Sequence, residues 1–370
     1  MIERKLLLGD EAIALGAVHA GISGVYAYPG TPSTEITEYI QGHAQEVRSR
    51  WCTNEKTAME AALGMSYAGK RALVCMKHVG MNVAADAFVN SAITGVNGGL
   101  VVLAADDPSM HSSQNEQDSR FYGKFAMIPI LEPSTQQEAY DMMKYAYALS
   151  EEKKLPVLLR VVTRLAHSRA GVVVNDLMPQ NALNPDKERT WVLLPAIARR
   201  QYASLVAKQP ELVESSEHSP YNGMNAFEGK AKLGVIACGI GYNYVMENDP
   251  QSLGIPVLKV SQYPLPEASI KALAAQCESL LVAEDGQPLV EEQVKAILGA
   301  DYALKGRLTG DLPRMGELTP DCVGAALGVN IEQPYTEAQN VIPRPPALCQ
   351  GCGHRDVYDA LNKVAAEYEN

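Results

Sequence analysis

Two stretches decide the fold: residues 72–80, ALVCMKHVG, and residues 98–108, GGLVVLAADDP. Each is a short apolar run that ends in polar residues with a glycine or a proline. Residues 24–32, GVYAYPGTP, and 155–164, LPVLLRVVTR, repeat this pattern. Helical patterns separate these runs, at residues 10–20, 33–47, 55–68 and 134–150. Continuous apolar strands that alternate with helices indicate a parallel sheet covered on both faces.

In such sheets, ligands bind where loops leave the carboxyl ends of the strands. We therefore expect the functional loops to follow Tyr28, Met76 and Ala105. Each loop also has an ordinary structural explanation. The turn at Thr31 can simply join a strand to a helix whose cap is Ser33 or Thr34, and an acid at a helix start can complement the helix dipole.

The rest of the chain predicts a second, smaller α/β segment. Residues 1–170 form the first domain, and residues 171–230 are polar and indicate a linker with short helices. Strand and helix patterns alternate again over 231–300. Residues 301–346 indicate an irregular, proline-rich connector, and 347–370 indicate the start of a further domain.

Composition excludes several classes of protein. The 370 residues carry a formal net charge of -11, which disfavours nucleic acid and anionic membrane surfaces as partners. No run approaches the roughly 20 apolar residues that span a bilayer, so a cytoplasmic protein is expected. Among seven cysteines, only Cys349 and Cys352 are closely spaced. Taken alone, this pair could be half of a zinc site, with His354 too near for the usual spacing.

The loops together carry a resemblance to a known family. Five stretches occur in this order: YPGTPSTEI, the long stretch from Asn54 to Asp86, DDPSMHSSQNEQDSR, LPVLLRVVTRLAHSR and LCQGCGHR. The chain closely resembles the α subunit of indolepyruvate:ferredoxin oxidoreductase, a thiamine-diphosphate-dependent 2-oxoacid oxidoreductase. The resemblance implies a parallel-sheet, pyrimidine-type thiamine-diphosphate-binding domain. A smaller transketolase C-terminal-like α/β domain follows it, with LLVAEDGQPLVEEQV as a typical stretch.

The resemblance also implies roles for individual residues. Glu55 looks like the catalytic carboxylate that activates thiamine diphosphate at the N1′ nitrogen of its aminopyrimidine ring. Thr31 and Arg120 correspond to groups near the substrate carboxylate, which a guanidinium can bind in a bidentate manner. Three further residues are candidates for lining the cofactor pocket: His78, Asn82 and Gln114.

The chain departs from the family pattern at its end. The pattern for Mg²⁺ and diphosphate, Gly-Asp-Gly followed by Asn, is absent, and the Glu284–Gly286 stretch does not replace it. The cofactor and its Mg²⁺ are therefore expected to be shared with a partner domain. No Cys-rich cluster run is present, so [4Fe-4S] clusters are expected elsewhere in the complex. In relatives a cysteine pair at this place can ligate a cluster, which makes Cys349 and Cys352 candidate ligands.

The resemblance predicts oxidative decarboxylation of an aryl pyruvate to an aryl-acetyl-CoA with reduction of ferredoxin. An oligomer with the β subunit of indolepyruvate oxidoreductase is expected, and the isolated chain is expected to be inactive. The alternative is a non-catalytic fragment or assembly subunit of such a complex. An orphan decarboxylase that works without ferredoxin is a third hypothesis, which the missing Mg²⁺ pattern disfavours.

Overall fold

The structure is a computed structural model that describes residues 3–185, 191–331, 340 and 347–368. The chain divides into two compact units, Met1–Asn330 and Ile331–Asn370. The sheets found in the described residues all belong to the first unit. Within the described part of the second unit, the regular element is the helix α14 (Gly353–Ala365).

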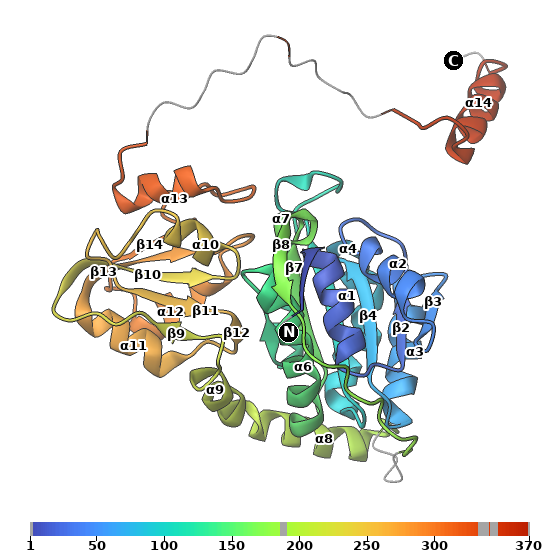
Figure 1. Ribbon diagram of the computed structural model, residues 1–370, viewed down its shortest axis with the longest axis horizontal. Coiled ribbons are helices and arrows are strands. Elements are labelled where there is room, and N and C mark those ends of the chain that lie inside the picture. The colour runs from blue at the N-terminus through green and yellow to red at the C-terminus, as the bar shows by residue number, and fades with distance from the viewer. Residues whose placement is uncertain (1–2, 186–190, 332–339, 341–346, 369–370) are drawn as a thin grey trace. The chain divides into compact units, whose positions relative to one another are not determined.

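The larger sheet of the first unit has seven strands in the order β12-β6-β7-β5-β4-β2-β3 (Figure 1). All neighbours run parallel except β12, which pairs antiparallel with β6. This confirms the parallel α/β fold predicted from the apolar runs. The strands are β2 (Gly24–Ala27), β3 (Arg48–Trp51), β4 (Ala72–Lys77), β5 (Leu100–Asp106), β6 (Ile130–Leu131), β7 (Val157–Val162) and β12 (Gln262–Tyr263).

Helices cover both faces of this sheet because its central strands are apolar on both sides. Leu73 and Cys75 of β4 join the core beneath one group of helices, whereas Val74 and Met76 join the core beneath the other. The first group contains α1 (Gly9–His19), α2 (Thr34–His43) and α6 (Gln136–Lys153), and the second contains α3 (Glu55–Tyr67) and α4 (His78–Thr94).

Smaller elements complete this part of the first unit. The strands β1 (Arg4–Leu8) and β8 (Arg169–Val173) form a separate antiparallel pair. In this pair, β1 contacts α1 and β8 contacts α6. Three short helical segments lie in the connections after β5 and β7. These are η1 (Pro108–Met110) and α5 (Arg120–Ala126) between β5 and β6, and α7 (Thr163–His167) directly after β7.

The smaller sheet has five strands in the order β14-β13-β10-β11-β9. Its central strands β10 (Ala231–Cys238), β11 (Val257–Val260) and β13 (Cys277–Ala283) are parallel. The helices α10 (Gly241–Met246), α11 (Glu267–Gln276) and α12 (Leu289–Leu298) alternate with strands, as the sequence predicted. The edge strands are β9 (Gly223–Met224) and β14 (Leu304–Lys305).

The chain passes between the two sheets more than once. The helices α8 (Pro195–Ala207) and α9 (Gln209–Glu217) lead from the larger sheet to the smaller one (Figure 1). The strand β12 then returns to pair with β6, although it follows β11 directly in the sequence. The larger sheet is therefore completed by residues from beyond position 230.

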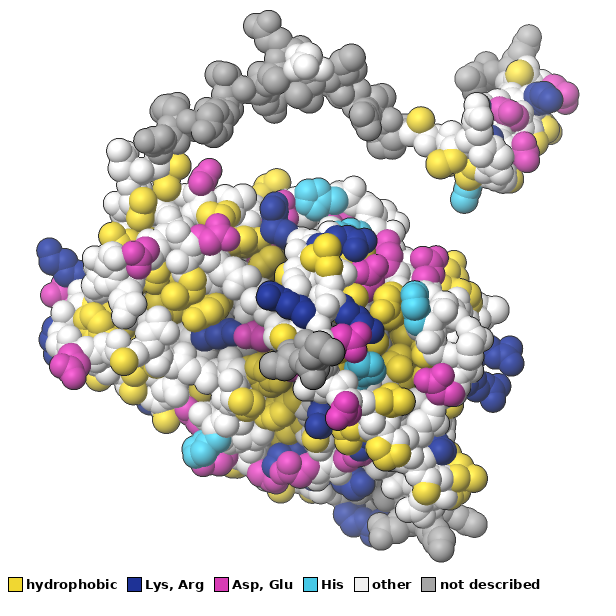
Figure 2. Space-filling view, in the orientation of Figure 1, with side chains coloured by type: hydrophobic (Ala, Val, Ile, Leu, Met, Phe, Trp, Pro, Cys, Tyr) yellow, Lys and Arg dark blue, Asp and Glu magenta, His cyan; other side chains and the backbone are white. Residues whose placement is uncertain are grey.

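The segment expected to be an irregular connector is only partly described. Its residues 301–331 include β14 and the helix α13 (Pro320–Leu327), whereas 332–339 and 341–346 lie outside the described residues. None of the helices in the described residues is both long and apolar enough to cross a bilayer. On the face shown in Figure 2, acidic and basic side chains are interspersed.

Candidate active site

The loops after β2, β4 and β5 leave the larger sheet at the same edge, because these strands are parallel neighbours. The turn after β2 lies against the end of β4. A Cβ atom added at Gly30 would lie 3.3 Å from the Cβ of Lys77. This edge therefore brings together the loops that the sequence singled out.

Two side chains hold the turn after β2. The Gly30 N–H donates to the Thr34 hydroxyl at 2.9 Å, and the Ser33 hydroxyl donates to the Gly30 carbonyl at 2.9 Å. Ser33 stands at the N-cap position of α2, but its side chain makes no capping bond to the helix. The hydroxyls predicted to cap the helix hold the turn instead, and the Thr31 side chain is exposed beside them.

Glu55 is the first residue of α3, which follows β3. The Asn54 side chain fixes this helix start by accepting from the Thr57 N–H at 2.9 Å. The Glu55 side chain lies against α4, since a Cβ at Gly80 would be 2.7 Å from its Cγ and 2.9 Å from its Oε1. Within the described residues, no hydrogen bond or ion pair engages the Glu55 carboxylate. Its acceptor sites are thus available to a ligand.

The three predicted pocket-lining residues differ in their surroundings. His78 is buried at the start of α4; its Nε2 lies 3.1 Å from the Asn115 carbonyl, and its Nδ1 has no hydrogen-bond partner in the described structure. Asn82, one turn further on, accepts a hydrogen bond from the Tyr122 hydroxyl at 2.5 Å. Gln114 is exposed. Gly80, against which Glu55 lies, stands between His78 and Asn82 in the first turn of α4.

Lys77 and Asp107 form a cluster that was not assigned to the site from the sequence. Lys77 is nearly buried, and its ammonium donates to the Ser112 carbonyl at 2.7 Å. Burial lowers the pKa of Lys77, although Asp107, 4.0 Å away, counteracts this. Polar residues directly after fully buried strands are the signal that could have identified both.

Asp107 organises the polar loop that follows β5. Its carboxylate accepts hydrogen bonds from Ser113, from the Ser112 N–H at 2.9 Å and from Thr163 at 2.9 Å. Burial acts to raise the pKa of Asp107, but these hydrogen bonds outweigh it and hold the pKa below its usual value. The loop therefore depends on an ionised Asp107.

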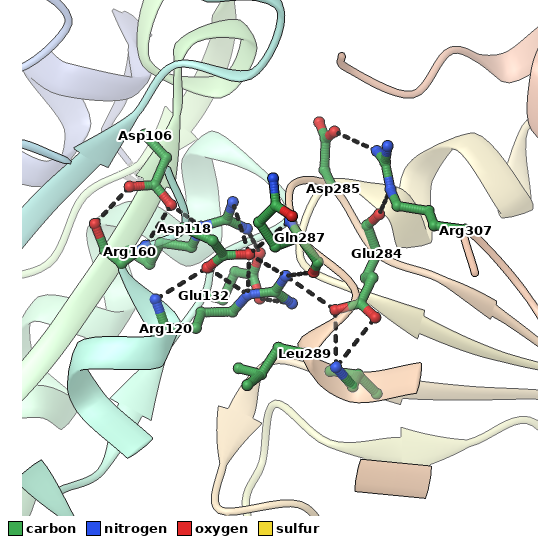
Figure 3. A network of polar contacts seen from close by, with 12 residues as sticks. Asp106, Asp118, Arg120, Glu132, Arg160, Glu284, Asp285, Gln287, Leu289 and Arg307 are labelled. Carbon is green, nitrogen blue, oxygen red and sulfur yellow. Dashed lines mark hydrogen bonds and ion pairs between the residues drawn. The ribbon is translucent and has the colours of Figure 1, made fainter. Parts of the chain in front are cut away.

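Arg120 lies in a buried network between the two sheets (Figure 3). Its guanidinium contacts Asp118 at 2.5 Å, Glu284 at 2.9 Å and the Gln287 carbonyl at 3.0 Å. Glu132, 3.7 Å away, is a further acidic neighbour. Arg120 is fully occupied by protein acceptors, so its assignment to a substrate carboxylate stays a prediction.

Arg160 extends this network and leaves it with more acids than bases. It binds Asp106 at 2.7 Å and also contacts Glu132. Four carboxylates, those of Asp106, Asp118, Glu132 and Glu284, thus face two guanidinium groups. Burial raises the pKa of Glu284 to about 7, although Arg120 counteracts it. The network is therefore expected to hold a proton near neutral pH.

The predicted cluster ligands lie in the second unit. Cys349 is exposed and Cys352 is half-buried, and the Cys352 sulfur lies 3.2 Å from His354 Nδ1. Among the described residues, no group of three metal-binding side chains includes either cysteine. Their role as cluster ligands stays a prediction.

Comparison with known proteins identifies the family. The family described as pyruvate flavodoxin/ferredoxin oxidoreductase, thiamine diphosphate-binding, matches residues 15–214. The indolepyruvate oxidoreductase subunit IorA of Methanothermobacter thermautotrophicus is 39% identical over 381 residues, which cover 99% of this chain. The same alignment covers 62% of that relative, so this chain spans about three fifths of its length.

Two solved structures share the fold. The 2-oxoglutarate:ferredoxin oxidoreductase of Magnetococcus marinus has a TM-score of 0.70 at 16% identity, over 88% of this chain and 65% of that one. A split-gene transketolase has a TM-score of 0.57 at 15% identity, over 87% of this chain and 97% of that one. These matches agree with a thiamine-diphosphate-binding domain followed by a transketolase C-terminal-like domain. The chain belongs to the thiamine-diphosphate-binding family of pyruvate flavodoxin/ferredoxin oxidoreductases.

Proposed function

We propose that this chain is the aminopyrimidine-binding part of a 2-oxoacid:ferredoxin oxidoreductase that acts on aryl pyruvates. The observation that carries this proposal is the Glu55 carboxylate, which lies against Gly80 at a sheet edge without a protein partner among the described residues. The names of the relatives favour indolepyruvate as the first substrate to test.

The residues at this edge fit the aminopyrimidine end of thiamine diphosphate. The bound cofactor would supply the electron sink for decarboxylation of a 2-oxoacid. Glu55 would hold a proton at the N1′ nitrogen of the ring. Gly80 leaves the space that the Glu55 side chain occupies, and the unpartnered Nδ1 of His78 offers a further polar contact on the same helix. Asn82 and Gln114 are assigned to the surrounding pocket.

Two cations are candidates for binding the substrate carboxylate. Arg120 is the one that the family resemblance indicates, but it would first have to release Asp118 or Glu284. Lys77 lies against the turn that carries Thr31 and is held mainly by neutral oxygens of Ser112. We therefore propose Lys77, with Thr31, as the alternative carboxylate contact. In the assembled enzyme, Lys77→Met should then raise KM for the 2-oxoacid more than it lowers kcat.

The complete reaction requires parts that this chain does not carry in its described residues. We propose that a partner domain holds the diphosphate and Mg²⁺, and that [4Fe-4S] clusters of the complex pass electrons to ferredoxin. Decarboxylation of the aryl pyruvate and capture by CoA would give an aryl-acetyl-CoA. The β subunit of indolepyruvate oxidoreductase is the expected partner, and Cys349 and Cys352 are assigned to a cluster at their junction with the partner domain.

The test is reconstitution of the chain with the diphosphate-binding part, the cluster-bearing part and the β subunit. We expect CoA-dependent reduction of ferredoxin with indolepyruvate, phenylpyruvate or hydroxyphenylpyruvate. Glu55→Gln should lower kcat at least about 100-fold, because it removes a proton-transferring carboxylate. Glu60→Gln is the matched control, since Glu60 is an exposed acid on the same helix.

Full activity of Glu55→Gln would contradict the assignment of this residue. A wild-type complex that assembles but reduces no ferredoxin with any of the three aryl pyruvates would contradict the proposed enzyme. That result would favour the non-catalytic assembly subunit instead.

A further inference from the structure

Three ligating side chains converge at a place that the proposed function does not use. Asp10, Glu35 and His167 each present one ligand atom, and these atoms lie within 4.8 Å of one another. The Nε2 atom of His167 is 3.8 Å from Asp10 Oδ2 and 3.7 Å from Glu35 Oε1. The three residues are far apart in the sequence, so the fold brings them together.

The carboxylates of this cluster are poorly satisfied by the protein. The Asp10 side chain is fully buried, and neither of its oxygens has a hydrogen-bond partner in the described structure. Glu35 Oε2 is also buried without a partner. Buried carboxylate oxygens are almost always hydrogen-bonded, and the exceptions point to a water or an ion. Three such oxygens at one place therefore call for a bound group.

We propose that Asp10, Glu35 and His167 bind a divalent transition-metal ion. One imidazole and two carboxylates form a mixed nitrogen and oxygen donor set, which suits Zn²⁺, Mn²⁺ or Co²⁺ better than the oxygen-seeking Ca²⁺ or Mg²⁺. Ligand atoms 3.7 and 3.8 Å apart need only small movements to meet one ion at about 2.1 Å. Water fills the remaining positions from the solvent side, where Glu35 and His167 are about one-third exposed.

The elements that carry the ligands explain why the cluster forms. Asp10 and Glu35 stand in the first turns of α1 and α2, where a helix start favours negative charge. His167 ends α7, which lies directly against the start of α1, since a Cβ at Gly9 would be 2.1 Å from the Leu165 carbonyl oxygen. A bound ion would tie these three helix ends together.

The ion would also steady the turn that carries Thr31. Glu35 follows Thr34, whose hydroxyl accepts from the Gly30 N–H across that turn. Binding is expected to strengthen as the pH rises. Burial and the neighbouring Glu35 and Glu11 raise the pKa of Asp10, and the ion must displace that proton.

The test uses Co²⁺, whose visible absorption reports coordination by a protein, added to the metal-free 370-residue chain. Cys349→Ser and Cys352→Ser are present in every chain compared, because these free thiols are themselves candidate metal ligands. We expect a d–d absorption band that saturates at one Co²⁺ per chain, that Zn²⁺ abolishes, and that is stronger at pH 8 than at pH 6. Asp10→Asn and His167→Gln should each weaken Co²⁺ binding at least about tenfold. Asp10→Asn keeps the shape of the side chain and is expected to fold.

The matched control is His218→Gln, because His218 and Glu214 form an exposed pair 3.5 Å apart on a helix end without a buried carboxylate. This variant should bind Co²⁺ as the wild type does. Absence of a saturable band in the wild type would overturn the proposal and would assign a shared proton to the cluster. Unchanged binding by Asp10→Asn and His167→Gln would overturn it as well, by placing the ion elsewhere.

Discussion

Glu55 depends on the absence of a side chain at one neighbouring position. An alanine at Gly80 would place its Cβ 2.7 Å from the Glu55 Cγ and 2.9 Å from the Cβ of Met76. We expect Gly80→Ala to displace Glu55 and to lower the activity of the reconstituted complex at least about tenfold, because catalysis depends on positions held within about 1 Å. The measurement is ferredoxin reduction, with far-UV circular dichroism to confirm folding.

Gly64→Ala separates this local effect from the general effect of glycine in a helix. Gly64 lies within α3, and a Cβ there meets no atom within 4 Å. This variant should be stabilised by roughly 0.5–1 kcal/mol, as is usual when alanine replaces glycine inside a helix. Equal activity of Gly80→Ala and the wild type would show that Glu55 does not need its observed position.

At the residue scale, the sequence predicted candidate site residues but not the side chains that contact them in the fold. Glu55 could be singled out because it stands at a helix start within a family pattern. The surroundings of Arg120 could not be predicted, because Glu132 and Glu284 come from other parts of the chain. The contact of His167 with Asp10 could not be predicted either, because these residues are far apart in the sequence and only the fold brings them together.

Removal of one partner from the buried ion pairs between the two sheets is expected to destabilise the fold strongly. Arg160→Met leaves the buried Asp106 without a guanidinium partner and leaves Glu132 with Arg120 alone. Breaking such a buried pair typically costs 3–5 kcal/mol, and we expect about that loss in the free energy of unfolding. Urea denaturation measures it. Arg164→Ala, which removes an exposed partner of Glu317, should cost less than about 1 kcal/mol.

The same network predicts how stability depends on pH. Glu284 has a pKa of about 7 in the folded chain, above the usual value of about 4.3 in an unfolded one. The folded state therefore binds the proton more tightly, and this contribution is complete below about pH 4 and lost as the pH rises through 7. Its size is up to roughly 4 kcal/mol.

Urea denaturation at pH 5, 6, 7 and 8 tests this dependence. The wild type should lose stability over this range more steeply than Glu284→Gln, which has no proton to lose at that position. Asp285 has a raised pKa of about 6. It adds a smaller loss of stability with rising pH, which is the same in the wild type and in Glu284→Gln. Parallel curves for the two chains would show that Glu284 does not hold the proton.

At the element scale, burial decided which strands could be predicted. The strands β2, β4, β5 and β7 are buried along their whole length and stood out as apolar runs. In contrast, β3 has the sequence RSRW and is largely exposed at the sheet edge, so its composition gave no signal. The two-residue strands β6 and β12 are too short for any periodic pattern and exist only through their pairing.

For the whole molecule, the pairing of β12 with β6 makes the larger sheet depend on the second half of the chain. A chain shortened to residues 1–230 would lose β12 together with Glu284 and Tyr263, both neighbours of Arg120. We expect it to aggregate or to unfold at a lower temperature, because it exposes a sheet edge and unpaired charges. A chain of residues 1–330 should remain monodisperse in size-exclusion chromatography.

A monodisperse 1–230 chain with the wild-type melting temperature would contradict this dependence. The parallel pairing of the central strands in each sheet could be anticipated from the alternation of strands and helices. The return of β12 to the first sheet could not, because nothing in a two-residue segment distinguishes one sheet edge from another.

The shared strand also limits how the protein can move. A clamshell opening between the two sheets would separate β12 from β6 and expose Arg120 and Arg160 with their acids to water. A hinge motion of one sheet relative to the other would therefore need much free energy to open the candidate site at the carboxyl ends of the strands. We expect the loop from Asp107 to Ser119 to move more readily, since its Ser109 and Met110 are exposed and hydrogen bonds to Asp107 hold it in place of a shared strand. Small molecules would then enter and leave the site when hydroxyl groups such as that of Ser113 release the Asp107 carboxylate. Such loop motions are faster than the motion of a whole domain.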